Sequence, residues 1–431
     1  MSQTSKSMCL DLLLMIFYVC TIGAIVGSIS GLVPGIHVNT LAALILVFND
    51  TLESLISIIV PDDYAPVMLA CMVVSAAVVH SATDFIPSLF FGVPDAENTL
   101  NIMPGQEMLL EGHGMVAIRC AAIGSLVGAF ASIILSIPMY YLLSNGLGDY
   151  LDSLTIGVLI SVLALMIYRE REGRRILGLA LICGSGALGC VTMSMDLPFV
   201  NVFGMEPESM FPMLSGLFGI PALLISPPSG HIPPQEDDEI LPIGPIPGLK
   251  GTVTGSIMGW YPGVTSSCGA SVASSVFGEE DKRGYVSTIS SIGTSATMFT
   301  FIALAVSGKE RSGTMAVVNG ILDGAPIRPF DDTFVAILIT MAISSILAYL
   351  IMIQAGKIMC KVIEHVDVSK MNTAVLTLMI VLTILFTGYW GLVLLLACTL
   401  LGLVPVVFDA NRMHLTGCLI VPVLLFKLGL M

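Results

Sequence analysis

The chain has 431 residues, of which 55% are hydrophobic and 11% are charged, whereas a soluble domain carries about 25% charged residues. Its formal net charge is −14 and its mean hydropathy is +0.94. This composition places the chain in a lipid bilayer and argues against a nucleic-acid partner, which would need a basic surface. Ten cysteines without a CxxC pair predict neither a metal cluster nor a disulfide framework. We therefore expect an all-α polytopic protein of the cell membrane, in contact with membrane lipid.

The first apolar segment, residues 10–29, is expected to be a retained membrane span that runs into Pro34 and Gly35. Proline removes a backbone donor, and glycine adopts conformations that a helix does not use. In hydrocarbon such a break persists only where it is buried in protein or lines a wet cavity. The sequence therefore predicts a broken or re-entrant helix at this point.

The same pattern recurs 228 residues later, where residues 251–268 repeat the plan of residues 23–40. The two stretches read GAIVGSISGLVPGIHVNT and GTVTGSIMGWYPGVTSSC, with seven identities within thirteen positions. A constant offset over so many matches indicates an internal duplication. Paired breaks in two halves are typical of the binding site of a secondary transporter. The alternative is a pair of kinked helices that pack through Gly-x3-Gly faces.

Residues 80–108 are too polar to cross lipid and too apolar to be a free loop, so we expect a re-entrant hairpin there. Four arginines lie within residues 169–175, and the positive-inside rule places this loop in the cytoplasm. Further spans of the first half are expected at residues 117–143, 154–168, 176–193 and 213–225.

We expect three parts: a first transmembrane repeat (residues 1–225), a proline-rich acidic linker (226–248) and a second transmembrane repeat (249–431). In the second repeat the run Ser-Ala-Thr-x-Phe from Ser295 matches the run from Ser81 at an offset of 214. With short and re-entrant pieces included, we expect about ten to twelve membrane elements. The two repeats are predicted to insert with opposite topology, as inverted repeats.

The two breaks and the polar residues that follow them are the candidate substrate ligands. Broken helices present unpaired N–H groups and a partial positive charge at their N-termini, so they favour an anion. His37 taken alone could equally be a hydrogen-bonded structural histidine. The predicted substrate site consists of Pro34, Gly35, His37, Asn39, Thr40, Pro262, Gly263, Thr265, Ser266 and Ser267.

Three carboxylates, Asp84, Asp95 and Glu97, are candidates for coupling transport to Na⁺ or H⁺, because carboxylates at membrane depth are costly and usually mark ion pathways. Asp95 and Glu97 equally suit a helix cap after Pro94, and the sequence leaves both interpretations open. The six scattered histidines give no metal-ligand spacing. We expect no cofactor, no metal site and no enzymatic activity.

The Pro34-Gly35 and Pro262-Gly263 motifs resemble the paired Pro-Gly signatures of the large permease subunit of tripartite tricarboxylate transporters, the TctA family. Residues 85–125 and the tail from Gly402 to Pro422 resemble that family as well. The resemblance implies an inverted-repeat transporter of carboxylate-bearing anions, driven by an ion gradient. It also implies two partners, a small membrane subunit and an extracytoplasmic binding protein. Residues 36–39 depart from the family pattern, which indicates a divergent, archaeal branch. Whether this branch works with the two partners stays open.

These observations predict a secondary transporter that holds a small organic anion, such as a di- or tricarboxylate, between the two broken helices. The alternative is a translocase for a polyprenyl-phosphate lipid carrier, whose headgroup would suit the same elements. A third class, a membrane scaffold without transport activity, predicts that the two breaks do not meet near the bilayer centre.

Overall fold

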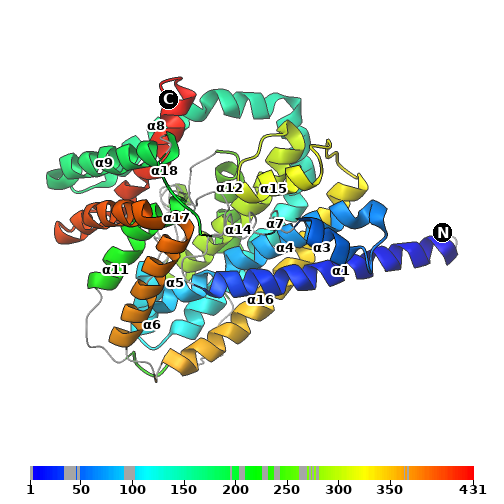
Figure 1. Cartoon of the computed structure of the whole chain (residues 1–431), viewed down its shortest axis with the longest axis horizontal. Coiled ribbons are helices and arrows are strands. Elements are labelled where there is room, and N and C mark those ends of the chain that lie inside the picture. Colours follow the sequence, from blue (N-terminus) through cyan, green and yellow to red (C-terminus); the bar gives the residue numbers. More distant parts are fainter. Residues whose placement is uncertain are drawn as a thin grey trace.

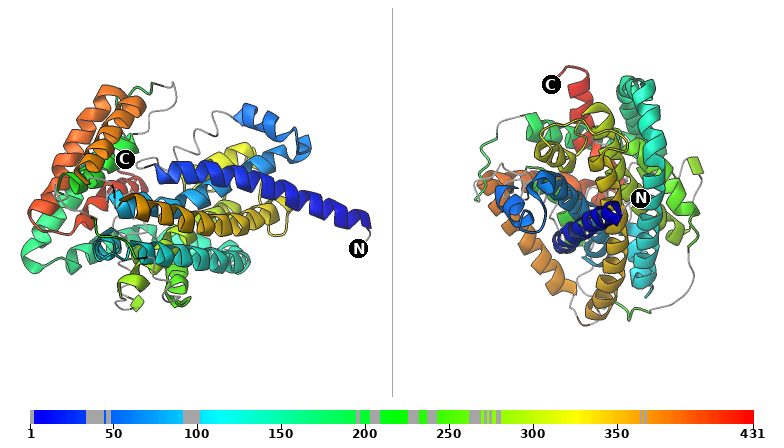
Figure 2. Two further views of the ribbon diagram at one scale, coloured as in Figure 1. Left: turned by 90° about the horizontal axis from the view of Figure 1, so that it is seen from below. Right: turned by 90° about the vertical axis from the view of Figure 1, so that its right-hand side faces the viewer.

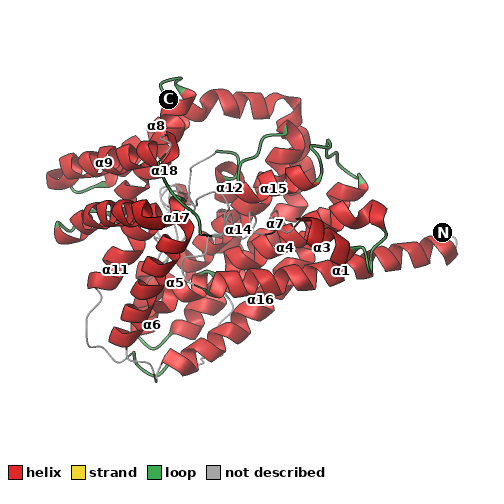
Figure 3. Cartoon of the chain, viewed as in Figure 1, coloured by secondary structure: helices red, strands yellow, loops and turns green. Residues whose placement is uncertain are grey.

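The structure of the chain is a computed structural model whose regular secondary structure is helical throughout its described part, with no strand among those residues (Figure 3). The described residues are 3–33, 45, 49–91, 102–194, 197–202, 209–225, 232–236, 243–261, 269–270, 273, 276–277, 281–363, 365 and 368–431.

The helices follow the two halves expected from the sequence (Figure 1). The first half contributes α1 (Gln3–Leu32), α3 (Asn49–Ile56), α4 (Ala65–Thr83), α5 (Phe85–Phe91), α6 (Ile102–Leu110), α7 (Gly114–Leu142), α8 (Gly148–Arg169), α9 (Arg175–Ser194), α10 (Met210–Leu214) and α11 (Ile220–Ile225). The second half contributes α12 (Ile246–Met258), α14 (Lys282–Ser307), α15 (Gly313–Ile321), α16 (Asp332–Ile363), α17 (Val368–Val407) and α18 (Gly417–Lys427).

Seven of the described stretches are long and apolar enough to cross a membrane, since about 20 apolar residues span its hydrocarbon core. One of them, Gly114–Arg169, holds both α7 and α8, which meet at Gly146 with a φ of 105° that favours glycine. α17 breaks in the same way at Gly388, between two predicted spans. The chain is therefore an all-α, multi-pass membrane protein, as predicted, while the full number of membrane elements stays a prediction.

The two glycine-rich helices pack on their neighbours in the same way, α1 on α4 and α12 on α14. A Cβ added to Gly23 would come within 2.5 Å of the carbonyl oxygen of Met72. One added to Gly255 would come within 2.7 Å of the carbonyl oxygen of Ile292. Each glycine row therefore lets two helix backbones touch, which is how small residues drive helix association in membranes.

One hydrogen bond is repeated in both halves and fixes which residues correspond. Ser75 Oγ donates to the carbonyl of Cys20 at 2.8 Å, and Ser291 Oγ donates to the carbonyl of Gly248 at 2.6 Å. The two acceptors are 228 positions apart and the two donors 216 positions apart. The predicted offset of 214 around Ser81 is therefore wrong by two residues, because helix packing fixes the equivalence and a five-residue match does not.

The two halves interlock through α7 and α16. α4 of the first half packs against α16, and α14 of the second half packs against α7. Gly356 lies against Ile118, and the rings of Tyr140 and Phe334 lie 6.1 Å apart. α7 and α16 therefore run antiparallel along each other (Figure 2). The repeat relates the two contacts to each other. Phe334 corresponds to Ile118 and Gly356 corresponds to Tyr140, each 216 positions later in the sequence.

A second hydrophobic cluster lies beside this interlocked core and joins the ends of the two halves. It contains Leu181 of α9, Met213 of α10, Cys398 of α17 and Leu415 before α18. Figure 1 shows α9, α17 and α18 gathered on one side of the molecule, away from the N-terminus. The two halves are thus in contact in both the core and the outer cluster.

The re-entrant hairpin predicted from His80 begins too early. α4 and α5 form a nearly continuous apolar stretch, Asp62–Phe90, that is long enough to cross a membrane. Its polar residues, among them His80 and Asp84, are buried among neighbouring helices rather than facing lipid. Enclosure by protein explains why the sequence is too polar for a lipid-facing span and still forms a helix.

The linker docks on the first half at residues 232–236. The side-chain oxygen of Gln235 accepts a hydrogen bond from the N–H of Gly114 at 2.8 Å. The N–H of Glu236 donates to the carbonyl of Gly112 at 2.9 Å. These contacts attach this part of the linker to the turn between α6 and α7.

Candidate functional site

The predicted substrate ligands lie outside the described residues, and so do Asp95 and Glu97. This applies to the whole set of Pro34, Gly35, His37, Asn39, Thr40, Pro262, Gly263, Thr265, Ser266 and Ser267. The structure describes the helices that precede the two motifs, α1 and α12, the helices they pack on, α4 and α14, and Asp84.

Each glycine-rich helix ends against a buried helix, at the last turn of α4 in the first half and near the middle of α14 in the second. At the end of α1, a Cβ on Gly31 would lie 2.9 Å from the carbonyl of His80 in α4. At the end of α12, a Cβ on Gly259 would lie 2.7 Å from the carbonyl of Ala296 in α14. His80 and Ala296 are equivalent residues, 216 positions apart. Both Pro-Gly motifs thus follow in sequence within four residues of a close backbone contact between helices.

α4 and α14 meet each other at the same level. Ser81 Oγ and Thr297 Oγ1 lie 3.5 Å apart, and either hydroxyl can donate to the other. Ser81 follows His80 directly, and Thr297 follows Ala296 directly. The contact therefore joins equivalent residues of the two halves, next to the points from which both breaks start.

These two hydroxyls keep solvent-accessible surface inside an otherwise buried region. Between Met68 and Phe90, Ser81 is the one residue that is not buried. Between Ser291 and Leu304 of α14, the residues that keep surface are Gly293, Ala296 and Thr297. Because α4 is surrounded by α1, α7, α14, α15 and α16, the surface at Ser81 lies within the helix assembly and not against lipid.

Asp84 lies one turn beyond Ser81, at the junction of α4 and α5, and its side chain is buried. Its N–H donates to the carbonyl of His80 at 3.0 Å, and Ser88 Oγ donates to its carbonyl at 2.9 Å. His80 Nδ1 lies 2.9 Å from Ser30 Oγ, which links α4 to the end of α1. The Asp84 carboxyl group thus lies within a stretch long enough to cross a membrane, near the end of α1, and its role in ion coupling stays a prediction.

A cluster around Asp152 holds Trp260 and Tyr261, which follow α12 and directly precede Pro262. Trp260 Nε1 donates to Asp152 Oδ1 at 3.0 Å, and the Tyr261 hydroxyl donates to the carbonyl of Leu151 at 3.2 Å. The Arg311 guanidinium pairs with Asp152 Oδ1 at 2.8 Å and stacks 5.3 Å from the centre of the Trp260 ring. Lys309 also pairs with Asp152. The start of the second break is therefore fastened to α8 of the first half.

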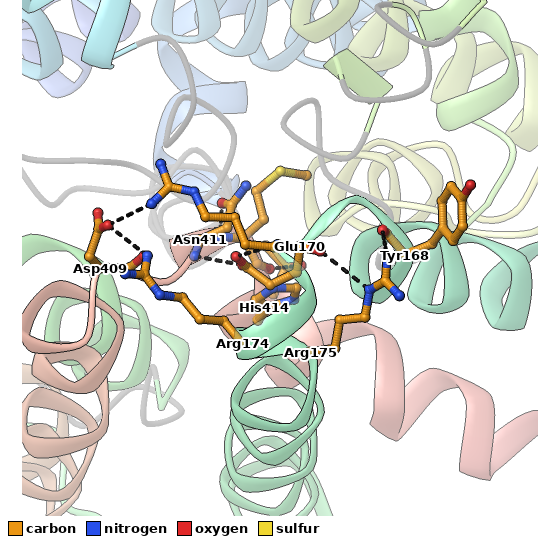
Figure 4. Close-up of polar contacts among 10 residues, drawn as sticks. Tyr168, Glu170, Arg174, Arg175, Asp409, Asn411 and His414 are labelled. Atoms are coloured by element: carbon orange, nitrogen blue, oxygen red, sulfur yellow. Dashed lines mark hydrogen bonds and ion pairs between the residues drawn. The ribbon is translucent and has the colours of Figure 1, made fainter.

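A further polar cluster joins the arginine-rich loop to the segment between α17 and α18 (Figure 4). Glu170 Oε2 lies 2.8 Å from His414 Nε2 and accepts the N–H of Asn411 at 2.9 Å. Arg171 and Arg174 both pair with Asp409. Burial alone would raise the pKa of Glu170, but the hydrogen bonds from Asn411, His414 and the Arg171 N–H together hold this pKa below its usual value. The arginines predicted to mark a cytoplasmic loop thus also contact the segment that precedes α18.

The sequence interpretation missed Ser81, Thr297 and the hydroxyl-rich face of α14. Residues 287–297 carry seven serines and threonines, which is a dense run for a membrane helix and is the signal that could have found them. Several of these hydroxyls serve packing, as Ser295 Oγ does by donating to the carbonyl of Gly128 at 3.3 Å. Thr297 differs because it is accessible and faces the other half.

Helices long enough for a bilayer, interlocked halves and an enclosed polar contact define the class of this molecule as a multi-pass membrane protein with a duplicated core. Among the described residues, no group of three or more His, Cys, Asp or Glu side chains could hold a metal ion. Residues 17–417 match the Tripartite tricarboxylate transporter TctA family. The chain therefore belongs to this family of membrane transporters, as the paired Pro-Gly motifs predicted.

The chain is also similar to an uncharacterised protein of the archaeon Methanocaldococcus jannaschii. The two are 24% identical over 420 residues, which cover 94% of this chain and 98% of that relative. This similarity agrees with the expectation of a divergent, archaeal member of the family. No solved structure matches the chain.

Proposed function

We propose that this protein is an ion-gradient-coupled permease for small organic anions such as di- and tricarboxylates. The substrate would be held between the two Pro-Gly breaks, and Asp84 would take part in coupling transport to Na⁺ or H⁺. Membership of a tricarboxylate transporter family supports the transport of such an anion. The same membership supports partnership with further components, which we propose to be a small membrane subunit and an extracytoplasmic binding protein.

The observation that carries the proposal is the accessible surface at Ser81 and Thr297, deep within the helix assembly. The described ends of α1 and α12, which precede the two Pro-Gly motifs in sequence, lie next to this surface, one from each half. A transporter needs its substrate site near the bilayer centre, at the interface of its repeats. A scaffold of kinked helices would have no reason to leave polar, accessible surface there, since buried space is normally filled.

The breaks supply the chemistry that an anion needs. After each Pro-Gly, a restarted helix would present free N–H groups and the positive end of its dipole. Asn39, Thr40, Thr265, Ser266 and Ser267 would add neutral donors. A carboxylate held in this way needs no buried lysine or arginine, which would be costly at membrane depth.

The packing of α7 and α16 supports inverted repeats. They are equivalent helices of the two halves, and they run antiparallel along most of their length. If both helices cross the bilayer, the two halves are oppositely oriented in it. A site between such halves can open to one side or the other when one half rocks against its mate.

The test is a thermal-shift screen of the purified full-length protein with citrate, succinate and a polyprenyl phosphate. A ligand that binds the folded state alone raises the unfolding temperature in a concentration-dependent way. We expect citrate or succinate to do so. Stabilisation by the polyprenyl phosphate alone would replace the proposal by the lipid-carrier translocase, and no stabilisation by any of them would favour the scaffold.

Four substitutions examine the site, two through ligand affinity in this assay and two through transport. Asn39→Ala and Thr265→Ala each remove one hydrogen bond to a charged group, so we expect affinity to fall roughly ten- to a hundredfold. Gly35→Leu and Gly263→Leu should abolish transport, because a side chain would enter the cradle. Parent-like carboxylate affinity in both Asn39→Ala and Thr265→Ala would remove these residues from the site.

A further inference from the structure

We propose that the hydroxyls of Ser81 and Thr297 are direct ligands of the transported anion and exchange their mutual contact for contacts to one carboxylate. The inference rests on the proposed function and adds two residues that the Pro-Gly motifs do not contain. It also assigns one ligand to each half of the molecule, at equivalent positions.

The first support is placement. Ser81 and Thr297 are each next in sequence to the residue that lies against the end of a glycine-rich helix. A substrate held between the two breaks therefore lies next to both hydroxyls. No other pair of equivalent side chains forms a hydrogen bond across the two halves in the described part of the chain.

The second support is accessibility combined with a weak existing contact. Both residues keep surface, whereas the packing hydroxyls Ser75, Ser291 and Ser295 are fully buried. The 3.5 Å separation of the two oxygens is at the long limit for a hydrogen bond between hydroxyls, whose usual separation is about 2.7–2.8 Å. Thr297 Oγ1 also donates to the carbonyl of Gly293 in its own helix at 3.0 Å, so binding another acceptor would exchange that bond as well as the long contact with Ser81.

The third support is chemical. A serine and a threonine hydroxyl each supply one donor, and a carboxylate offers two acceptor oxygens. Hydrogen bonds to an ionised acceptor are roughly twice as strong as those between neutral groups. A carboxylate between Ser81 and Thr297 would therefore accept two charge-assisted hydrogen bonds, in exchange for the long contact between the hydroxyls and the bond from Thr297 to the Gly293 carbonyl. Such a ligand would also connect the two halves, so that occupancy of the site affects their relative placement.

Binding measurements on folded variants test the first consequence. We expect Ser81→Ala and Thr297→Val each to weaken citrate or succinate binding by roughly ten- to a hundredfold. Thr297→Ser, which keeps the hydroxyl, should bind as the parent does. Ser295→Ala is the matched control, because this buried hydroxyl lies on the same helix and bonds to the Gly128 carbonyl. It should change unfolding temperature without changing affinity.

A cysteine pair tests the second consequence. Ser81→Cys combined with Thr297→Cys should form a disulfide under mild oxidation, identified by peptide mass spectrometry, and saturating citrate should slow its formation. Each single variant controls for pairing with the native cysteines. A pair that never forms contradicts the contact, and a pair whose rate ignores a carboxylate known to bind the parent contradicts the proposed ligands.

The outcomes separate this inference from the proposed function. If the parent binds a carboxylate and both Ser81→Ala and Thr297→Val bind it equally well, the two hydroxyls are structural and the permease proposal stands. If the parent binds neither citrate nor succinate, the permease proposal fails first and this inference falls with it.

Discussion

Gly27 lets α1 pack closely on α4, because the side chain of glycine is a single hydrogen atom. A Cβ at this position would meet the backbone of Ala76, lying 2.9 Å from its Cα, and a backbone cannot rotate away as a side chain can. Overpacking of this kind costs about 1–3 kcal/mol. We predict that Gly27→Ala destabilises the purified protein by this amount in thermal unfolding.

The matched control for Gly27→Ala is Gly157→Ala. Gly157 lies inside α8 and a Cβ there would meet nothing within 4 Å. Since alanine is the better helix former by about 1 kcal/mol, this variant should be as stable as the parent or slightly more stable. Equal losses in both variants would show that close backbone packing is not what Gly27 provides.

Glu170 gives a prediction about pH. Its carboxylate is buried, and hydrogen bonds from Asn411, His414 and the Arg171 N–H hold its pKa below the usual value despite that burial. A carboxyl whose pKa is lower in the folded state stabilises the fold above its unfolded pKa of about 4.3, and this contribution is lost as pH falls through the folded pKa. We predict that Glu170→Gln lowers stability at pH 7 by about 1–3 kcal/mol.

The difference between parent and Glu170→Gln should shrink as the pH falls below about 4, because the parent carboxylate then becomes protonated. Unfolding temperature measured against pH reports this directly. Glu172→Gln is the control, since the Glu172 side chain is 90% exposed and its ion pair with Arg175 is 3.9 Å long. A constant difference between parent and Glu170→Gln from pH 7 to pH 3 would contradict the assignment.

At the scale of elements, sequence patterns predicted where the helices lie. They predicted less well which helices are enclosed by protein and which face lipid. The glycine rows at Gly23 and Gly251 were visible because glycine spacing is a local property, and the structure places them in backbone contact as α1 on α4 and α12 on α14. The re-entrant hairpin predicted from His80 did not anticipate that residues 80–90 continue a helical stretch long enough to cross a membrane, with His80 and Asp84 buried among other helices. Hydropathy alone cannot distinguish a re-entrant hairpin from a helix enclosed by protein. The same limit hid the accessible hydroxyls Ser81 and Thr297, whose significance depends on a contact between halves.

The Asp152 cluster leads to a prediction about α12. Asp152 is 18% exposed at its side chain and Arg311 is 6% exposed, so the pair is largely desolvated. Removal of the charge by Asp152→Asn would leave the Arg311 guanidinium without its buried partner, which is costly. We predict that the end of α12, with Trp260 and Tyr261, then moves and that transport slows because the second break loses its anchor.

Trp260 fluorescence measures this movement. The chain has two tryptophans, and Trp390→Phe leaves Trp260 as the reporter. In that background Asp152→Asn should shift the emission to longer wavelength and make it more accessible to an aqueous quencher. Asp149→Asn, an exposed residue on the same helix, should do neither. Unchanged emission in Asp152→Asn would show that the end of α12 is held by packing alone.

At the scale of the whole molecule, the contacts indicate a duplication that extends beyond the Pro-Gly motifs into the outer helices. A Cβ on Gly216 would lie 2.7 Å from the carbonyl of Leu395, and a Cβ on Gly417 would lie 2.7 Å from the carbonyl of Ile182. The two glycines are 201 positions apart and the two acceptors 213. The exact division into residues 1–225 and 249–431 stays a prediction. The sequence alone did not reveal the extended duplication, because the offset changes at each loop while the packing is retained.

The same packing leads to a prediction about topology. Glu111 precedes α7 and Asp331 precedes α16, so the two mark equivalent ends of equivalent helices. α7 and α16 run antiparallel, with Ile118 beside Gly356 and Tyr140 beside Phe334. If both helices span the bilayer, Glu111 and Asp331 lie on opposite sides of the membrane. A parallel repeat would place both on one side.

Cysteine accessibility decides between these arrangements. Glu111→Cys and Asp331→Cys, introduced singly at these exposed positions, should react with a membrane-impermeant maleimide from opposite sides, one in intact cells and the other after the membrane is opened. The parent protein controls for the native cysteines, of which Cys183 is exposed. Glu172→Cys, within the arginine-rich loop, should react from the cytoplasmic side alone. If Glu111→Cys and Asp331→Cys are labelled from the same side, α7 and α16 cannot be equivalent helices that both span the membrane in an antiparallel contact. The inverted-repeat mechanism then fails.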